Sequence, residues 1–108
     1  MTAAVTQPRL AFDRSKLLAF CEMWDISRFE FFGSVLREDF GPQSDIDCMV
    51  TFGHAATWTL LDIVDMKEEL EALFGRTVDL VERRAVENSS NPYRRPAILG
   101  GARDVLTR

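Results

Sequence analysis

Cysteine, histidine and long apolar runs are all scarce in this chain of 108 residues. The two cysteines, Cys21 and Cys48, do not have the spacing of a metal-binding motif, and nothing in the sequence requires an oxidising compartment. The single histidine, His54, lies in a predicted loop, where a histidine is ordinarily solvated rather than catalytic. No apolar run approaches the length of a membrane span, and the N-terminus lacks the basic and apolar pattern of a signal peptide. We therefore expect a soluble protein of the cytoplasm.

The chain also has no excess of basic residues. Its formal net charge is −4 and its isoelectric point is near 4.9, which argues against indiscriminate binding of nucleic acid. We expect neither a direct nucleic-acid partner nor a membrane partner. Basic residues do gather in the last quarter of the chain: Arg83, Arg84, Arg94, Arg95, Arg103 and Arg108. Such a segment can bind a triphosphate or an acidic partner, but an ordinary solvated helix face explains it equally well.

The length is sufficient for one small domain with a single core. We expect a loose, flexible arm over residues 1–12 and a single domain over residues 13–108. Periodicity and capping residues predict helices over about 14–24, 59–74 and 84–87, with Asp13 as the first cap and Gly75 ending the second. A closing helix should be broken or frayed, because Pro96 and the glycine pair at 100–101 do not suit a regular helix. Strands are predicted over 26–32, 45–52 and 77–81.

Two aspartates open the second predicted strand. Alternate residues of a strand point to the same face, so Asp45 and Asp47 should lie side by side while Ile46 and Cys48 enter the core. Two neighbouring carboxylates repel each other unless a cation relieves them. Mg²⁺ usually takes one or two carboxylates together with substrate phosphates. The sequence therefore predicts a magnesium site at the start of this strand.

A Gly33-Ser34 pair follows the first strand, and a Gly-Pro turn separates it from Ser44. A glycine that begins a turn from strand to helix lets the backbone approach a phosphate and direct N–H groups toward it. We expect Gly33 and Ser34 to bind phosphate groups, with a short helix over 34–37 behind them. Ser44 is expected to orient or cap the turn that leads into Asp45.

A third acid, Asp79, interrupts the apolar strand over 77–81. Val78 and Leu80 should point into the core, which leaves Asp79 on the other face. An acid within a short apolar strand is costly unless it has a partner. Next to the second strand, Asp79 would complete a group of three with Asp45 and Asp47. The alternative is an aspartate on an edge strand that simply faces water.

These residues together resemble the signature of the polymerase-beta-like nucleotidyltransferase superfamily, because Gly33, Ser34, Arg37, Ser44, Asp45 and Asp47 occur in order within one short segment. The chain is similar in particular to the minimal nucleotidyltransferases, the MNT group, which act as antitoxins beside HEPN ribonuclease toxins. The resemblance implies an α/β (α+β) fold, a small mixed sheet with helices on one face. The site should lie on the other face, at the edge formed by the second and third strands.

The resemblance also implies roles for the residues that match. Asp45, Asp47 and Asp79 would bind magnesium, in one or two ions, and Asp79 would accept the proton of the attacking hydroxyl. Gly33 and Ser34 would hold the β and γ phosphates of ATP. Arg37 would neutralise the triphosphate, although pairing with Glu38 or Asp39 is an equal alternative.

The resemblance to MNT antitoxins implies that this chain transfers AMP from ATP to a tyrosine of the cognate HEPN toxin, which is thereby silenced. An alternative is an antitoxin that blocks the toxin by binding alone, with a vestigial site. A third possibility is transfer to a hydroxyl of RNA or of a small molecule. The acidic isoelectric point and the lack of a second domain argue against that third possibility.

Overall fold

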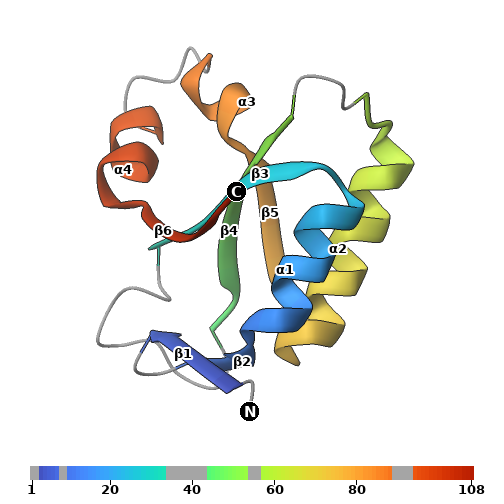
Figure 1. Ribbon diagram of the computed structural model, residues 1–108. Helices are drawn as coiled ribbons and strands as arrows, with labels where there is room; N and C mark the ends of the chain where they lie inside the picture. The colour runs from blue at the N-terminus through green and yellow to red at the C-terminus, as the bar shows by residue number, and fades with distance from the viewer. Residues whose placement is uncertain (1–2, 8–9, 34–43, 54–56, 89–93) are drawn as a thin grey trace.

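The core of the protein is a four-stranded mixed sheet in the order β5-β4-β3-β6 (Figure 1). The computed structural model describes residues 3–7, 10–33, 44–53, 57–88 and 94–108. β5 runs parallel to β4, whereas β3 is antiparallel to both β4 and β6. The mixed sheet with helices confirms the predicted fold class. The strands are β3 (Ile26–Phe32), β4 (Ile46–Phe52), β5 (Val78–Glu82) and β6 (Arg103–Thr107).

Two helices, α1 (Arg14–Met23) and α2 (Leu60–Phe74), cover one face of the sheet. α1 begins at Asp13, whose carboxylate accepts hydrogen bonds from the backbone N–H groups of its first turn. α2 begins with a capping box between Thr59 and Asp62 and ends at Gly75, which has a φ of 69°. Both predicted helices are therefore confirmed.

The main core lies between these helices and the sheet. Apolar side chains that alternate along β3 and β4 meet apolar side chains of the two helices. The predicted inward direction of Ile46 and Cys48 is confirmed, because both are fully buried. The main contributors are Phe29, Phe31, Ile46, Cys48 and Val50 from the sheet, with Leu17, Phe20, Met66, Leu70 and Phe74 from the helices.

The second face of the sheet is also partly covered, by α3 (Arg83–Glu87) and α4 (Arg94–Gly101). Val86 of α3 packs with Phe32 and Met49 in a small second core, to which Ile98 and Leu99 of α4 add. The expectation that helices pack on one face alone is therefore incomplete. In described residues, no helix is long and apolar enough to cross a membrane.

The closing helix needs a correction as well. α4 continues through Pro96 as a single helix of 8 residues, instead of breaking there. Pro96 is the third residue of this helix, where a backbone N–H has no partner within the helix, so proline removes no helical hydrogen bond. The glycine pair at 100–101 comes at the other end, where helices commonly stop.

The structure differs from the expected loose arm over residues 1–12 in that most of this segment has regular secondary structure. Residues of β1 (Ala3–Gln7) and β2 (Leu10–Asp13) pair as an antiparallel hairpin. The buried ring of Phe12 packs edge-on against Phe31, at a centroid distance of 5.9 Å, and against Phe74, at 5.3 Å. These long-range contacts attach the segment to the core, and a local reading of the sequence does not reveal them.

A buried ion pair joins the sheet to α3. Glu30 of β3 is only 2% exposed and is the one buried charged side chain in the described part of the chain. Arg83 Nη1 donates to both of its carboxylate oxygens, at 2.8 and 2.9 Å. Arg83 Nε also donates to Glu87 Oε2 at 3.0 Å. The hydrogen bond from Arg83 to Glu30 is the main cause that raises the pKa of the guanidinium.

We predict that Arg83→Ala lowers the free energy of unfolding by about 3 kcal/mol, because it leaves the buried Glu30 carboxylate without its principal partner. Urea unfolding followed by circular dichroism measures the change. Arg103→Ala, at an exposed arginine of β6, is the control and should change stability by less than about 0.5 kcal/mol. Equal losses in the two variants would contradict the structural importance of the pair.

Candidate active site

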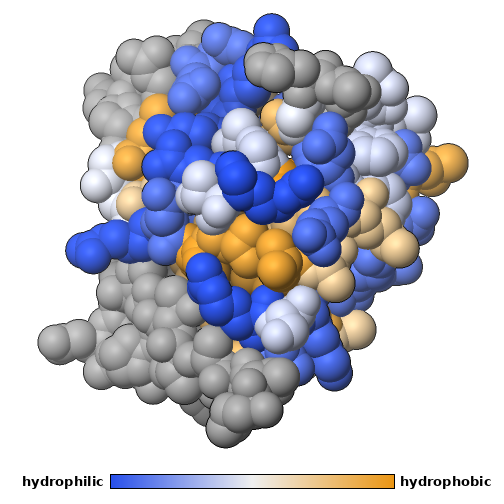
Figure 2. Space-filling view, in the orientation of Figure 1, coloured by the Kyte–Doolittle hydropathy of each residue, from blue (hydrophilic) through white to orange (hydrophobic). Residues whose placement is uncertain are grey.

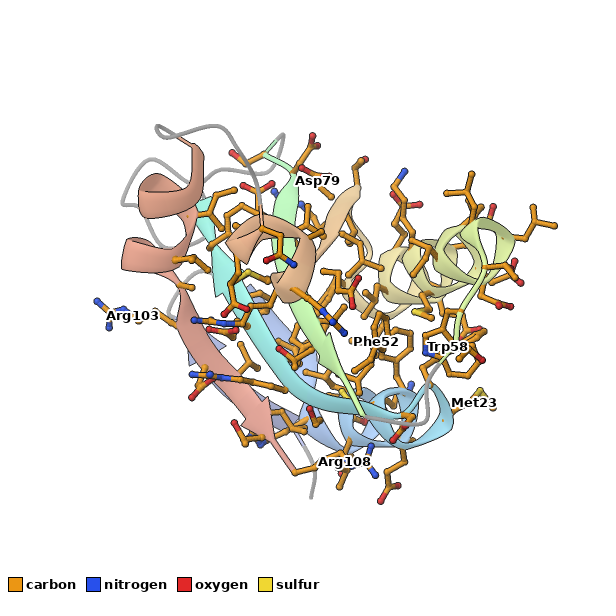
Figure 3. All side chains as sticks on the ribbon, turned by 90° about the horizontal axis from the view of Figure 1, so that it is seen from above. Met23, Phe52, Trp58, Asp79, Arg103 and Arg108 are labelled. Atoms are coloured by element: carbon orange, nitrogen blue, oxygen red, sulfur yellow. The ribbon has the colours of Figure 1, made fainter. Side chains whose placement is uncertain are left out.

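Parallel pairing brings two of the predicted acids together. Asp47 of β4 is the register partner of Asp79 of β5, so their side chains stand next to each other on the second face of the sheet. Asp47 is partly buried, whereas Asp79 is exposed at the edge strand. Asp45 is exposed and lies two residues before Asp47, at the entrance to β4. Figure 3 shows Asp79 at one end of the sheet.

Gly33 allows the Asp47 carboxylate to occupy this position. It follows the last residue of β3, Phe32, which is the register partner of Asp47. Its φ is 73°, a backbone conformation that favours glycine. A Cβ atom placed on Gly33 would overlap Asp47 Oδ2. The predicted phosphate-binding role of Gly33 stays a prediction, and the structure adds a second reason for glycine at this position.

The thiol next to these acids is not available as a nucleophile. Cys48 follows Asp47 but points into the main core, where it is fully buried. Burial raises the pKa of the Cys48 thiol well above its usual value, and the negative charges of Asp47 and Asp79 raise it further. The thiol therefore stays protonated at neutral pH.

An arginine that the sequence analysis did not single out ties the start of β4 to the turn before β5. Arg76 Nη2 donates to the backbone carbonyl of Ser44 at 2.6 Å. The backbone N–H of Ile46 donates to the carbonyl of Thr77 at 2.9 Å. The two hydrogen bonds fix the backbone on either side of Asp45. Arg76 stands 32 residues from Ser44, and an arginine after a helix-ending glycine looks like an ordinary surface cation.

Within the described ranges, no group of three His, Cys, Asp or Glu side chains is close enough together to enclose a metal ion. Register places Asp47 next to Asp79, whereas Asp45 lies just before β4 and has no register partner. A pair of carboxylates nevertheless fits Mg²⁺, because this ion takes few protein ligands and fills its shell with water and substrate phosphates. The metal-binding roles of these acids stay predictions.

The other predicted site residues are placed only in part. Ser44 is partly buried, and its expected role in the turn stays a prediction, because residues 34–43 lie outside the described residues. Ser34 and Arg37 lie outside the described residues, as do the short helix predicted over 34–37 and the loop residue His54.

The comparison with known proteins identifies the family. A profile of the nucleotidyltransferase domain matches residues 14–105 of this chain. The chain therefore belongs to the nucleotidyltransferase domain family. A protein of Methanocaldococcus jannaschii, described as a candidate protein adenylyltransferase, is 40% identical over 81 residues. That match covers 75% of this chain and 81% of the relative.

Solved structures agree with this assignment and confirm the resemblance to the MNT group. A candidate minimal nucleotidyltransferase superposes with a TM-score of 0.64 at 34% identity, covering 85% of this chain and 88% of its own. A complex of the tri-AMPylated Shewanella oneidensis HEPN toxin with an MNT antitoxin superposes with a TM-score of 0.59 at 19% identity. That match covers 87% of this chain and 69% of the other and shows the shared fold alone.

We predict that Gly33→Ala lowers nucleotidyl transfer at least about tenfold, because the new methyl group displaces the Asp47 carboxylate. Gly75→Ala is a matched control, since Gly75 has a similar φ of 69° but nothing within 4 Å of an added Cβ. Backbone strain should lower the stability of both variants by about 1 kcal/mol. Equal activity in the two variants, measured by pyrophosphate release from ATP, would contradict the role of Gly33.

We also predict that Arg76→Ala lowers nucleotidyl transfer by about tenfold through displacement of the backbone at Ser44 and Asp45. Arg76→Lys should restore little, because a lysine ammonium does not reproduce the reach and planar geometry of the guanidinium. Pyrophosphate release and urea unfolding together separate a local effect from loss of fold. A variant with full turnover would show that the hydrogen bond to Ser44 is dispensable.

Proposed function

We propose that this chain is an antitoxin that transfers AMP from Mg-ATP to a hydroxyl group of a cognate HEPN ribonuclease toxin and so neutralises the toxin. The observation that carries the proposal is the pairing of Asp47 with Asp79, next to Gly33, which leaves room for the Asp47 carboxylate. Membership of the nucleotidyltransferase family and the adenylyltransferase description of the Methanocaldococcus relative support it. The complex of an AMPylated HEPN toxin with an MNT antitoxin supports the choice of partner.

The acids at this end of the sheet would bind the metal ion, and one of them would also accept a proton. Asp45 and Asp47, with Asp79 beside them, would hold magnesium through carboxylate oxygens. When bound, the metal would supply positive charge that stabilises the triphosphate as the reaction proceeds. The half-burial of Asp47 favours a fixed position for its carboxylate, and the Arg76 hydrogen bond holds the backbone at its entrance.

Asp79 is suited to receive the proton of the acceptor. Its carboxylate is exposed on the edge strand, so a hydroxyl group carried by another protein can reach it. The acceptor oxygen would attack the α-phosphorus of ATP, and the bond to the pyrophosphate oxygen would break. The proton of the hydroxyl would pass to Asp79, and the products would be an AMP ester of the partner and pyrophosphate. We propose tyrosine as the acceptor residue.

The test is transfer of label from ATP labelled at the α-phosphate to the cognate HEPN protein that we propose as the partner. We expect label on the partner in the presence of Mg²⁺ and a loss of at least about 100-fold in Asp47→Asn. Mass spectrometry of the product then identifies the acceptor residue. Asp65→Asn, on the exposed face of α2, is the control and should transfer label at the rate of the wild type.

A tight complex without any label on the partner would contradict the enzymatic proposal. Neutralisation by the variant that combines Asp45→Asn with Asp47→Asn would also contradict it. Either result would favour an antitoxin that acts by binding alone. Label on an RNA in place of the partner would contradict the choice of substrate.

A further inference from the structure

A groove lined by four arginines lies on the same sheet face as the acids, at the opposite end of the strands. The arginines are Arg28, Arg83, Arg84 and Arg108, and the groove has a volume of about 470 Å³. Glu87 is the one acidic residue among the described residues that line it, and it accepts a hydrogen bond from Arg83. In Figure 3, Asp79 and Arg108 lie at opposite ends of the sheet. Thr51 of β4 also lines this groove and is four residues from Asp47, which corresponds to roughly 13 Å along an extended strand. We call this feature the arginine groove.

Two of these arginines are fixed by carboxylates. Arg28 donates from Nε and Nη2 to the two oxygens of Asp104, at 2.6 and 3.2 Å. Arg83 is held by the buried Glu30 and by Glu87. These pairs leave little charge to offer a ligand, but they give the groove rigid walls.

The other two arginines keep their charge available. Neither Arg84 nor Arg108 forms an ion pair with a carboxylate in the described residues. Arg84 is exposed on α3, where hydrophilic residues gather at the top of Figure 2. Arg108 Nη1 donates to the carbonyls of Cys21 and Ile26, so its guanidinium is held in place while other N–H groups remain for a ligand. Guanidinium N–H groups match the geometry of a carboxylate.

A second hollow adjoins the arginine groove and has a different character. It measures about 660 Å³ and shares Thr51 and Arg84 with the groove. Phe52, Trp58 and Ile63 supply apolar walls, and Figure 3 shows Phe52 and Trp58 side by side. Leu60, also part of its wall, is 79% exposed. Arg84 thus stands between a hollow with aromatic walls and a groove with basic walls.

This combination fits a protein segment better than a nucleic acid. A nucleic-acid backbone requires an extended row of unpaired cations, whereas the arginine groove offers only Arg84 and Arg108 in a chain of net charge −4. A short acidic segment with a large apolar side chain would place its carboxylates on the two arginines. Its apolar side chain would enter the neighbouring hollow.

We propose that the arginine groove and its neighbouring hollow dock an acidic segment of the protein substrate, and thereby present the acceptor hydroxyl to Asp47 and Asp79. This inference rests on the proposed transfer to a protein. Asp47 and Asp79 lie on the same face, so one bound partner can span the short distance between docking segment and reacting group.

The experiment measures how three forms of the chain interact with the proposed HEPN partner: wild type, Arg84→Glu and Arg103→Glu. Arg103 is exposed near the start of β6, on the side of the sheet away from Trp58 (Figure 3), so it is a matched charge reversal outside the groove. Titration calorimetry measures the Kd of the complex, and label transfer measures kcat and KM for the protein substrate and for ATP.

We expect Arg84→Glu to raise both the Kd of the complex and the KM for the protein substrate by about tenfold or more. The KM for ATP and kcat should stay unchanged, and Arg103→Glu should remain within about twofold of the wild type. A second outcome is a complex that the Arg84→Glu change weakens but in which no label reaches the partner. This outcome would support the docking site and contradict only the proposed catalysis.

Equal Kd and KM values in the two charge-reversal variants would overturn the docking site, and so would a wild-type chain that does not bind the HEPN protein. A third result would overturn the choice of ligand. In that case a 20-nucleotide single-stranded RNA would bind in an Arg84-dependent manner and displace the protein partner. Circular dichroism of both variants verifies that each one is folded.

Discussion

The parallel pairing of β4 with β5 is the constraint on which the rest of this structure depends. Parallel strands need a crossover, which α2 provides, and the register places Asp79 next to Asp47. A shift of this register by one residue would turn the side chain of Asp79 into the main core. The buried alternation of Ile46 and Cys48 opposes such a shift because it fixes which face of β4 carries the acids. The energy of the core thereby determines the geometry of the carboxylates.

The second face of the sheet is divided by the small helices that cover its middle. At one end Asp47 lies next to Gly33, and at the other the arginine groove is lined in part by Arg83 and Arg84 of α3. The buried pair of Glu30 and Arg83 attaches α3 between them. Burial of this pair is costly unless both charges are present, so the position of α3 is strongly specified once the pair forms. The same pair that stabilises the fold therefore shapes one wall of the proposed docking site.

Local chemistry made much of this structure predictable. Asp13, Thr59 and Gly75 each satisfy backbone groups within a few residues, so the helix ends could be recognised in sequence. The strand β6 could not be predicted, because its partner β3 is far away in the sequence. The hairpin of β1 and β2 is local, but the contacts of Phe12 with Phe31 and Phe74 that attach it to the core are distant. In β6 only Val105 and Leu106 are buried, and its charged residues conceal the strand pattern.

The candidate site could likewise be predicted only in part from the sequence. Alternation along β4 predicted the outward direction of Asp47, and an acid within an apolar strand predicted the place of Asp79 beside it. The expected shared face of Asp45 and Asp47 stays a prediction, because Asp45 lies before β4. The hydrogen bond of Arg76 to Ser44 and the close approach of Gly33 to the Asp47 carboxylate join segments that meet only in the folded chain. We propose that Asp47 and Asp79 act as one site for Mg-ATP. Calorimetry of ATP binding with and without Mg²⁺ tests it most directly, with Asp79→Asn compared to Glu82→Gln at the far end of β5. We predict that only Asp79→Asn loses the tightening of ATP binding by Mg²⁺, whereas an unchanged magnesium effect in Asp79→Asn would contradict the claim.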